Sequence, residues 1–130
     1  MDLIADTTLL IGIWRGQDWA TSFARSNPQT MGLPWIVLAE FWQGAIRAGH
    51  ATKVVNQFLA LGMPLFNAEP VVLVYAELCS CLQVKSYYKG IGQNDLWIAA
   101  VSLAYNKPLV TRNRRHFARI DGLDLQVLAP

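Results

Sequence analysis

Three carboxylate side chains lie in strongly apolar stretches of this sequence, which holds only nine acidic residues. Asp6 follows Leu-Ile-Ala, Glu40 stands between Val-Leu-Ala and Phe-Trp, and Asp95 precedes Leu-Trp-Ile-Ala-Ala. A buried carboxylate is costly unless it is paired with a cation or hydrogen-bonded. No Lys or Arg stands at helical spacing from any of the three. Carboxylates without a cationic partner indicate a missing cation, and hard oxygen ligands favour Mg²⁺ or Mn²⁺.

Each of these residues also has a simpler interpretation when it is taken alone. Asp6 is a good N-cap for a helix that follows it, and Glu40 fits the solvent side of an amphipathic helix. Asp95 fits the first turn of a helix, where the helix dipole favours an acid. The joint pattern is more specific than any one member, so we treat a shared metal site as the working hypothesis.

The elements that must position these residues alternate between short apolar runs and longer helical patterns. We expect strands at 3–5, 30–33, 63–66, 109–111 and 125–128, helices at 9–25, 35–48, 51–61, 70–85 and 95–105, and a polar turn or short helix at 112–118. This alternation predicts an α/β fold with three α/β/α layers, Rossmann-like, around a central, mostly parallel sheet. Ligands of such sheets sit beyond the carboxyl ends of the strands. Asp6 and the segment 111–113 should therefore project to the same edge.

A few residues mark where these helices begin, weaken or end. Gly12 and Gly16 weaken the first helix, and Pro34 suits the first turn of the helix at 35–48. Gly49 fits the C-terminal end of that helix. Asn94 is expected to cap the helix that begins at Asp95. The segment 86–92 between the last two long helices reads as a loop.

The bulk composition bounds the class of protein. The 130 residues suffice for a single domain, 1–130, whose core needs no disulfide. A hydrophobic fraction of 53% fits either a sheet covered on both faces or an apolar face that meets a partner. Cys79 and Cys81, two positions apart, would point to different sides of a helix, so we expect ordinary thiols there.

Nothing in the sequence predicts contact with a membrane. The apolar stretch at 3–14 is interrupted by Asp6 and has no basic region before it, unlike a secretory signal. No apolar run approaches the roughly 20 residues that a spanning helix needs. The expectation is a soluble, cytoplasmic protein, which low cysteine use also fits.

Four segments in order resemble the PIN-domain family and, within it, the toxins of the VapC type. They are Leu-Ile-Ala-Asp-Thr-Thr at 3–8, Leu-Ala-Glu-Phe-Trp-Gln-Gly at 38–44, Ile-Gly-Gln-Asn-Asp-Leu-Trp-Ile-Ala-Ala at 91–100 and Leu-Val-Thr-Arg-Asn-Arg-Arg-His-Phe at 109–117. Ile-Asp-Gly-Leu at 120–123 is also similar. The resemblance spans nearly the whole chain and implies a metal-dependent ribonuclease that cuts RNA as an endonuclease.

The resemblance assigns the metal-site role to Asp6, Glu40 and Asp95, as both metal ligands and catalytic residues. One departure stands out, because many members carry a further acid where this chain has Asn113. Asn113 would then be a neutral ligand or a water anchor, which leaves open whether one or two metal ions bind. Thr7 and Thr111 are expected to support the carboxylates by hydrogen bonds.

The remaining polar residues near the expected site have two interpretations each. Arg112, Arg114 and Arg115, with Arg119 close by, suit RNA phosphates, but they equally suit a solvated face or a contact with an antitoxin. The loop 85–89, with two lysines and two tyrosines, suits either base stacking or packing. His116 and His50 are expected to be structural or surface residues rather than general bases, and Asp121 and Asp124 turn residues.

The resemblance also implies partners: a VapB-like antitoxin whose tail fills the active-site groove, and a second copy of the chain in a homodimer. Two alternatives remain at this point. One is a catalytically weakened PIN-like module that binds RNA or protein, which the Asn113 departure favours. The other is a metal-dependent hydrolase of DNA or of a small phosphate ester.

Overall fold

Five short parallel strands form the centre of the computed structural model, which describes residues 1–26, 29–66, 68–84 and 90–128. They lie in the order β3-β2-β1-β4-β5. Their bounds are β1 Leu3–Ala5, β2 Met31–Pro34, β3 Met63–Leu65, β4 Leu109–Thr111 and β5 Leu125–Val127. Every described strand pair is parallel. The expected α/β sheet is confirmed, and it is parallel throughout rather than mostly so.

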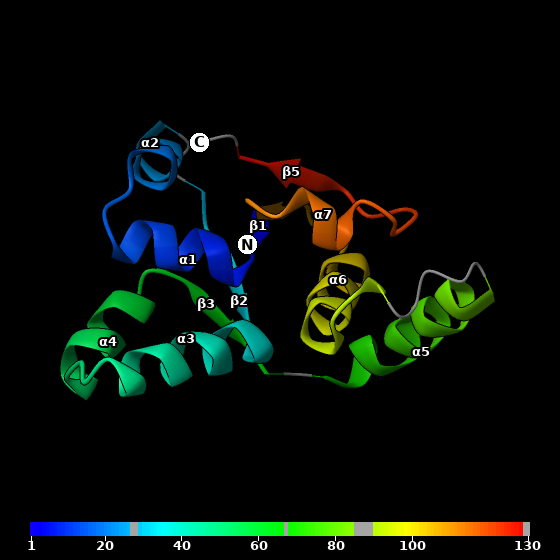
Figure 1. Cartoon of the computed structure of the whole chain (residues 1–130), viewed down its shortest axis with the longest axis horizontal. Helices are drawn as coiled ribbons and strands as arrows, with labels where there is room; N and C mark the ends of the chain where they lie inside the picture. Colours follow the sequence, from blue (N-terminus) through cyan, green and yellow to red (C-terminus); the bar gives the residue numbers. More distant parts are fainter. Residues whose placement is uncertain (27–28, 67, 85–89, 129–130) are drawn as a thin grey trace.

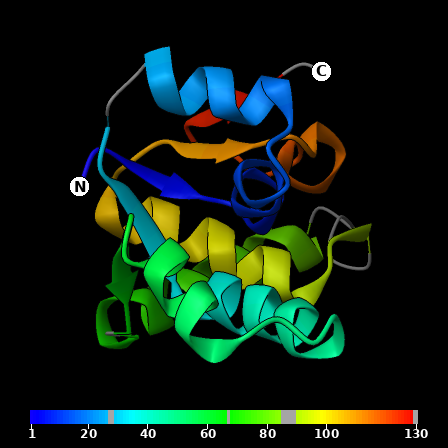
Figure 2. The same cartoon turned by 90° about the vertical axis from the view of Figure 1, so that its left-hand side faces the viewer.

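Seven helices flank this sheet in the described part of the chain. Figure 1 shows α1 to α4 on one side of the strands and α5, α6 and α7 on the other. Their bounds are α1 Thr7–Trp14, α2 Asp18–Ser26, α3 Trp35–Arg47, α4 Thr52–Leu59, α5 Glu69–Val84, α6 Gln93–Tyr105 and α7 Arg114–Phe117. In Figure 2 the molecule is turned so that the side with α1 to α4 faces the viewer. Each parallel connection needs such a crossover, and the crossovers cover both faces.

Burial on both faces explains why the strands read as uninterrupted apolar runs. Leu3, Ile4 and Ala5 of β1 are at most 1% exposed, and Leu109 and Val110 of β4 are fully buried. They pack with apolar side chains of the helices in one contiguous core. Cys79 and Cys81 are both free thiols, as expected. Among the described residues, no helix is both long and apolar enough to cross a bilayer.

The prediction of one helix over 9–25 was wrong, because the chain turns between α1 and α2. Gly16 adopts φ +66° there, a left-handed conformation that side chains with a Cβ disfavour. Trp19 of α2 then folds back against Gly12 of α1, where hydrogen in place of a side chain permits the close approach. The two glycines thus divide the segment instead of merely weakening it.

Two smaller expectations at helix starts were also wrong. Gly92, not Asn94, holds the N-cap position of α6, and Asn94 lies inside the first turn. Pro34 is the last residue of β2 and precedes α3 rather than lying in its first turn. Gly49 follows α3 with φ +78°, as its expected position at the helix end requires. The predicted loop at 86–92 lies largely outside the described residues.

Candidate active site

Asp6 stands where β1 ends and α1 begins, and its side chain is only 3% exposed. The residue occupies the N-cap position, yet its carboxylate makes no capping hydrogen bond. Instead Oδ2 accepts hydrogen bonds from Thr111 Oγ1 at 2.6 Å and from Thr8 Oγ1 at 2.9 Å. The simple interpretation of Asp6 as a helix cap therefore does not account for its side chain.

Thr111 joins the two central strands at this point. It ends β4, which lies beside β1, and its side chain is fully buried. The hydroxyl that donates to Asp6 also accepts the backbone N–H of Asn113 at 2.9 Å. Thr8 accepts the backbone N–H of Arg112 at 3.1 Å in the same way. The hydroxyls thus connect the Asp6 carboxylate to the backbone that follows β4.

Glu40 reaches the same region from α3 and is half-buried. Its Oε1 accepts a hydrogen bond from Thr7 Oγ1 at 2.7 Å, across 33 residues of sequence. Thr7 begins α1, directly after Asp6. The start of α1 therefore supplies one hydroxyl to each of two carboxylates, through Thr8 to Asp6 and through Thr7 to Glu40.

Asp95 lies in the first turn of α6, and its side chain is 20% exposed. Its Oδ2 lies 2.8 Å from Nδ1 of His116 on α7. Burial raises the pKa of the Asp95 carboxyl, His116 lowers it, and the carboxylates of Asp6 and Glu40 raise it further. The net direction of the pKa is upward, chiefly because of burial, and part of it comes from the repulsion between Asp95 and the other two carboxylates. A cation between them would relieve that repulsion.

All three carboxylates share a bonding pattern. One oxygen of each is held by a hydroxyl or an imidazole of another element, while the second oxygen receives no hydrogen bond from the described residues. A protein donor therefore orients each carboxylate without using its full capacity as an acceptor. This is the arrangement expected of carboxylates that ligate a metal and are oriented by surrounding hydrogen bonds.

A pocket of about 270 Å³ collects these side chains at the carboxyl ends of β1 and β4. It is lined by Asp6, Thr7, Thr8, Ile11, Glu40, Gly92, Asn94, Asp95, Asn113 and His116. The structure thus brings together all three predicted carboxylates, Thr7 and Asn113. Thr111 supports the pocket from behind Asp6 rather than lining it.

The donor set fits Mg²⁺ or Mn²⁺, though no preformed cage is present. No group of three or more His, Cys, Asp or Glu side chains in the described part of the chain forms a ready metal-binding cluster. Mg²⁺ does not require one, because it keeps several waters and seldom binds in a cage made of protein groups alone. Oxygen ligands, an open pocket and repelling charges together favour a hydrated hard cation.

Two residues of the pocket escaped the sequence analysis. Thr8 received no role of its own there and stood only within the segment 3–8, although it contacts both Asp6 and Thr111. His116 was expected to be structural or on the surface, and it does lie 47% exposed, but its ring contacts Asp95. The sequence offered two indications of these contacts. Thr8 lies close to Asp6 at the end of a predicted strand, and His116 lies three residues after Asn113.

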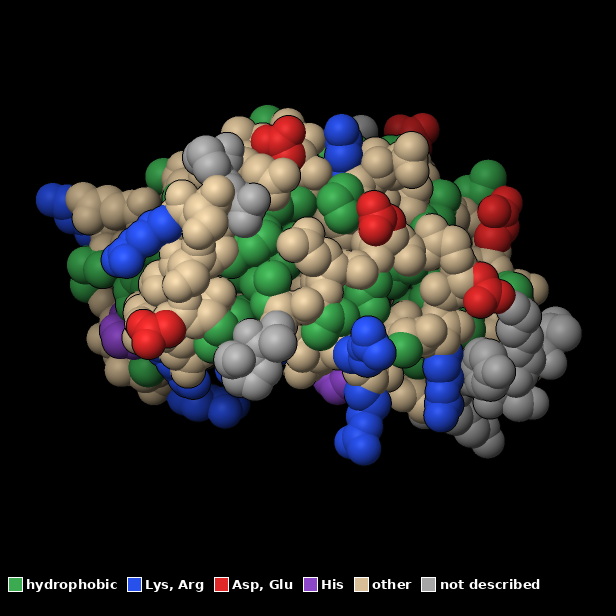
Figure 3. Space-filling model, turned by 90° about the horizontal axis from the view of Figure 1, so that it is seen from above, with side chains coloured by type: hydrophobic (Ala, Val, Ile, Leu, Met, Phe, Trp, Pro, Cys, Tyr) green, Lys and Arg blue, Asp and Glu red, His purple; other side chains and the backbone are tan. Residues whose placement is uncertain are grey.

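The arginines after β4 point to different neighbours. The Arg112 guanidinium lies 4.7 Å from the ring centre of Trp19, in a cation–π contact. Arg114, Arg115 and Arg119 line a separate open hollow of about 590 Å³ with Gly90 and Ala118. Figure 3 shows Lys and Arg side chains projecting along one long edge of the molecule, with a His side chain at the same edge.

Comparison with known proteins identifies the fold and the family. A model of the PIN domain matches residues 3–123. Ribonuclease VapC of Rickettsia bellii is 32% identical, covering 96% of this chain and 95% of that protein. Ribonuclease VapC1 of Haemophilus influenzae strain R2866 is 39% identical, covering 72% of this chain and 71% of that protein.

Solved structures give the same answer. The structure of VapBC2 from Rickettsia felis bound to a DNA fragment from their promoter contains a chain with TM-score 0.79 and 29% identity, covering 99% of this chain and 100% of that chain. A chain in the DNA-bound VapBC structure from Salmonella typhimurium has TM-score 0.85 with 98% of each chain covered, and its 21% identity supports the fold alone.

The parallel sheet, with carboxylates gathered at its carboxyl edge, is therefore that of a PIN domain, and the chain belongs to the PIN-domain family. Within that family it belongs to the VapC ribonucleases, the toxins of VapBC toxin–antitoxin modules. The resemblance seen in the sequence is thereby confirmed.

Proposed function

We propose that this chain hydrolyses RNA phosphodiester bonds with Mg²⁺ or Mn²⁺ held by Asp6, Glu40 and Asp95. The observation that carries the proposal is the shared bonding pattern of these three carboxylates around one pocket. A bound divalent cation supplies Lewis-acid polarisation of the phosphate and lowers the pKa of a bound water. A neutral Asn113 at the rim would assist as a ligand or as a water anchor.

The protein's own groups prepare the pocket for that chemistry. Thr8 and Thr111 hold Asp6, Thr7 holds Glu40, and His116 holds Asp95, so each carboxylate keeps its orientation before substrate arrives. Preorganised groups of this kind avoid the cost of reorganising at the moment of reaction. Thr7 and Thr111 therefore act as positioning residues.

Arginines beyond β4 are proposed to hold the RNA backbone near the pocket. Arg114 and Arg115 are exposed, and Arg114 begins α7 directly after Asn113. Guanidinium groups bind phosphate oxygens without reading sequence. Arg112 is proposed to contribute too, although its contact with Trp19 restricts its reach.

Two protein partners complete the proposal. The solved VapBC assemblies from Rickettsia felis and Haemophilus influenzae contain related chains, which supports a VapB-like antitoxin for this chain. A homodimer is also proposed, since large apolar side chains such as Ile46, Phe66 and Leu73 are exposed on the single chain. Such a toxin would act in the cytoplasm, where its RNA substrate is found.

The test is digestion of a mixed RNA pool by the full chain, with Mg²⁺, with Mn²⁺ and with EDTA. Asp6→Asn and Asp95→Asn should each reduce the cleavage rate by at least about 100-fold, because a metal ligand supports several kcal/mol of transition-state stabilisation. Asp124→Asn is the matched control, since Asp124 is exposed and does not line the pocket. It should cleave like the wild type.

Three other results would contradict parts of this proposal. Cleavage that survives Asp95→Asn would contradict the assigned site. RNA binding without cleavage in any metal, by folded protein, would favour the weakened binding module and make Asn113 the residue to explain. Faster digestion of DNA than of RNA under the same conditions would contradict the substrate class.

A further inference from the structure

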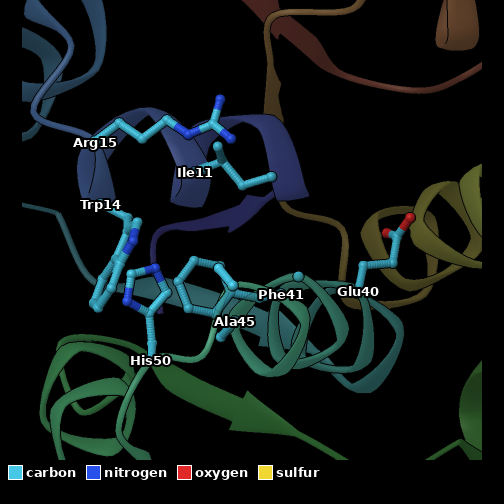
Figure 4. A pocket seen from close by; sticks show the side chains of 9 residues that line it. Ile11, Trp14, Arg15, Glu40, Phe41, Ala45 and His50 are labelled. Carbon is cyan, nitrogen blue, oxygen red and sulfur yellow. The ribbon is translucent and has the colours of Figure 1, made fainter.

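A second pocket, of about 120 Å³, opens beside the candidate active site between α1 and α3. Figure 4 shows its lining residues: Ile11 and Trp14 on α1, Arg15 directly after α1, and Glu40, Phe41 and Ala45 on α3. His50, which follows α3, closes one end of it. The two pockets share Ile11 and Glu40, so the second pocket adjoins the candidate active site at these two side chains.

Aromatic side chains form one wall of this second pocket. Trp14 makes edge contacts with Phe41 at 5.7 Å and with His50 at 5.1 Å between ring centres. Phe58 of α4 supports both rings from behind, stacked on Phe41 at 5.3 Å and edge-on to Trp14 at 5.1 Å. Phe41 is buried and Trp14 half-buried, so the braced Trp14 ring is the one that offers a rigid surface to a flat ligand.

Polar groups stand only around the rim of this aromatic pocket. Arg15 and His50 are exposed and supply N–H donors, while Glu40 stands on the side of the carboxylates. A phosphate inside the pocket would face the negative Glu40, whereas a neutral ring with polar edges would meet apolar walls and donors at the rim. Single-stranded RNA is read by such combinations of aromatic surfaces with donors.

We propose that the aromatic pocket accepts one nucleobase of the RNA, from a nucleotide next to the phosphate that is cut. The inference rests on the proposed function, because it takes the cut phosphate to lie at the carboxylates. The adjacency of the two pockets at Ile11 and Glu40 fits the short step along the backbone from a phosphate to its neighbouring base. Arg15 at the rim would then face the next phosphate of the strand.

Gly44 offers a way to fill the aromatic pocket without disturbing the fold. Glu40, Gly44 and Ala48 are four residues apart along α3 and its end, and all three line the pocket. A Cβ added at Gly44 meets nothing within 4 Å. Leucine also favours a helix more than glycine does. Gly44→Leu should therefore fold normally and occupy the space of a base.

The experiment compares two RNA oligonucleotides that differ at a single nucleotide. The cut site is mapped first. One substrate is then left intact, and the other carries an abasic ribonucleotide next to the cut. The abasic position is placed first on one side of the cut and then on the other. We expect the wild type to lose about ten-fold in kcat/KM on the abasic substrate at one of the two positions. On the intact substrate, kcat/KM of Gly44→Leu should be about ten-fold below that of the wild type. On the abasic substrate the two proteins should have the same kcat/KM.

Gln43→Leu is the matched control, because Gln43 is an exposed neighbour on α3 that does not line the pocket. It should discriminate between the two substrates as the wild type does. If Gly44→Leu lowered kcat/KM relative to the wild type equally on both substrates, the substitution would have disturbed the protein generally, and the proposal would be overturned. Unchanged cleavage of both by Gly44→Leu would also overturn it and leave a protein segment as the occupant to consider.

A binding measurement separates this inference from the proposed function. Fluorescence anisotropy in EDTA, with the abasic position scanned along a labelled oligonucleotide, needs no cleavage. An about ten-fold loss of affinity at one position, absent in Gly44→Leu, would support the base pocket even if the protein cut nothing. Equal affinity for all oligonucleotides would overturn the base pocket, even if cleavage were efficient.

Discussion

Asn113 is the residue at which this site departs most clearly from a fully acidic one. It is half-buried, lines the pocket, and its backbone N–H is held by Thr111. Its position is therefore fixed by the same hydroxyl that orients Asp6. A carboxylate in its place would enter the pocket with nearly the same shape and one more negative charge.

We predict that Asn113→Asp binds Mn²⁺ about ten-fold more tightly than the wild type, because a charged oxygen replaces a neutral one. Isothermal titration with Mn²⁺ measures both the affinity and the number of ions bound. Asn113→Ser, which removes the side-chain amide without adding charge, is the control and should bind no more tightly. Unchanged affinity in Asn113→Asp would show that this position lies outside the metal's reach.

Asp95 carries a second prediction, which concerns stability and pH in the absence of metal. Burial raises the pKa of its carboxyl in the folded protein. The folded state therefore holds that proton more tightly than the unfolded chain, and stability falls as the pH rises through the folded pKa. Asp95→Asn should raise the melting temperature in EDTA at about pH 7.5, and the gain should shrink as the pH falls towards about 4.

Calorimetry from about pH 4 to 8 checks this expectation, with Asp124→Asn as an exposed control. A gain that is the same at every pH would show that Asp95 ionisation is not its source. Saturating Mg²⁺ should reverse the order of the two melting temperatures, because the ion stabilises the protein with all three ligands more than the variant that lacks one.

At the scale of elements, the site depends on how closely α1 approaches its neighbours. α1 supplies Thr7 and Thr8 to the carboxylates and packs against both α2 and α3. Gly12 of α1 is buried, and a Cβ there would lie 2.5 Å from the Trp19 ring and 2.8 Å from the Ala20 Cβ. Gly44 of α3, by contrast, faces open space.

These two helical glycines should respond oppositely to the same substitution. Gly12→Ala should lower the free energy of unfolding by about 1–3 kcal/mol, because α2 must move to relieve the overlap. Gly44→Ala should raise it by up to about 1 kcal/mol, because alanine favours the helix and meets no obstacle. Urea unfolding of both variants measures the difference. A stabilised Gly12→Ala would mean that α2 adjusts at no cost.

At the scale of the whole molecule, the site ties together distant parts of the chain. Thr7 reaches Glu40 across 33 residues, and Thr111 reaches Asp6 across 105. Asp95 adds α6, on the opposite side of the sheet from α1 and α3. An ion held by these carboxylates would therefore link both helical layers, and no isolated segment could form the site.

Metal binding should consequently stabilise the entire domain rather than one loop. At about 100 times the dissociation constant, Mn²⁺ should add about 2.7 kcal/mol, or roughly 10 °C in melting temperature for a chain of this size. Thermal unfolding with increasing Mn²⁺ measures this shift. The Asp6→Asn/Asp95→Asn double variant should show little of it. An equal shift in the double variant would place the ion elsewhere.

The sequence by itself determined the layers of this fold and the carboxylates of the site. Buried strands read as apolar runs such as Leu-Ile-Ala because both faces of the sheet are covered. An acid such as Asp6 at the end of such a run is conspicuous, since burial makes it costly. These features depend on neighbours along the chain, so they can be read from it directly.

Only the tertiary structure decided which groups hold those carboxylates. The contacts of Thr8 with Asp6 and of His116 with Asp95 depend on strand order and on helix packing. The division of the predicted helix at Gly16, and the aromatic pocket between α1 and α3, likewise arise from contacts between separate elements. Local sequence periodicity carries no information about such distances, because they are set by how the elements pack against one another.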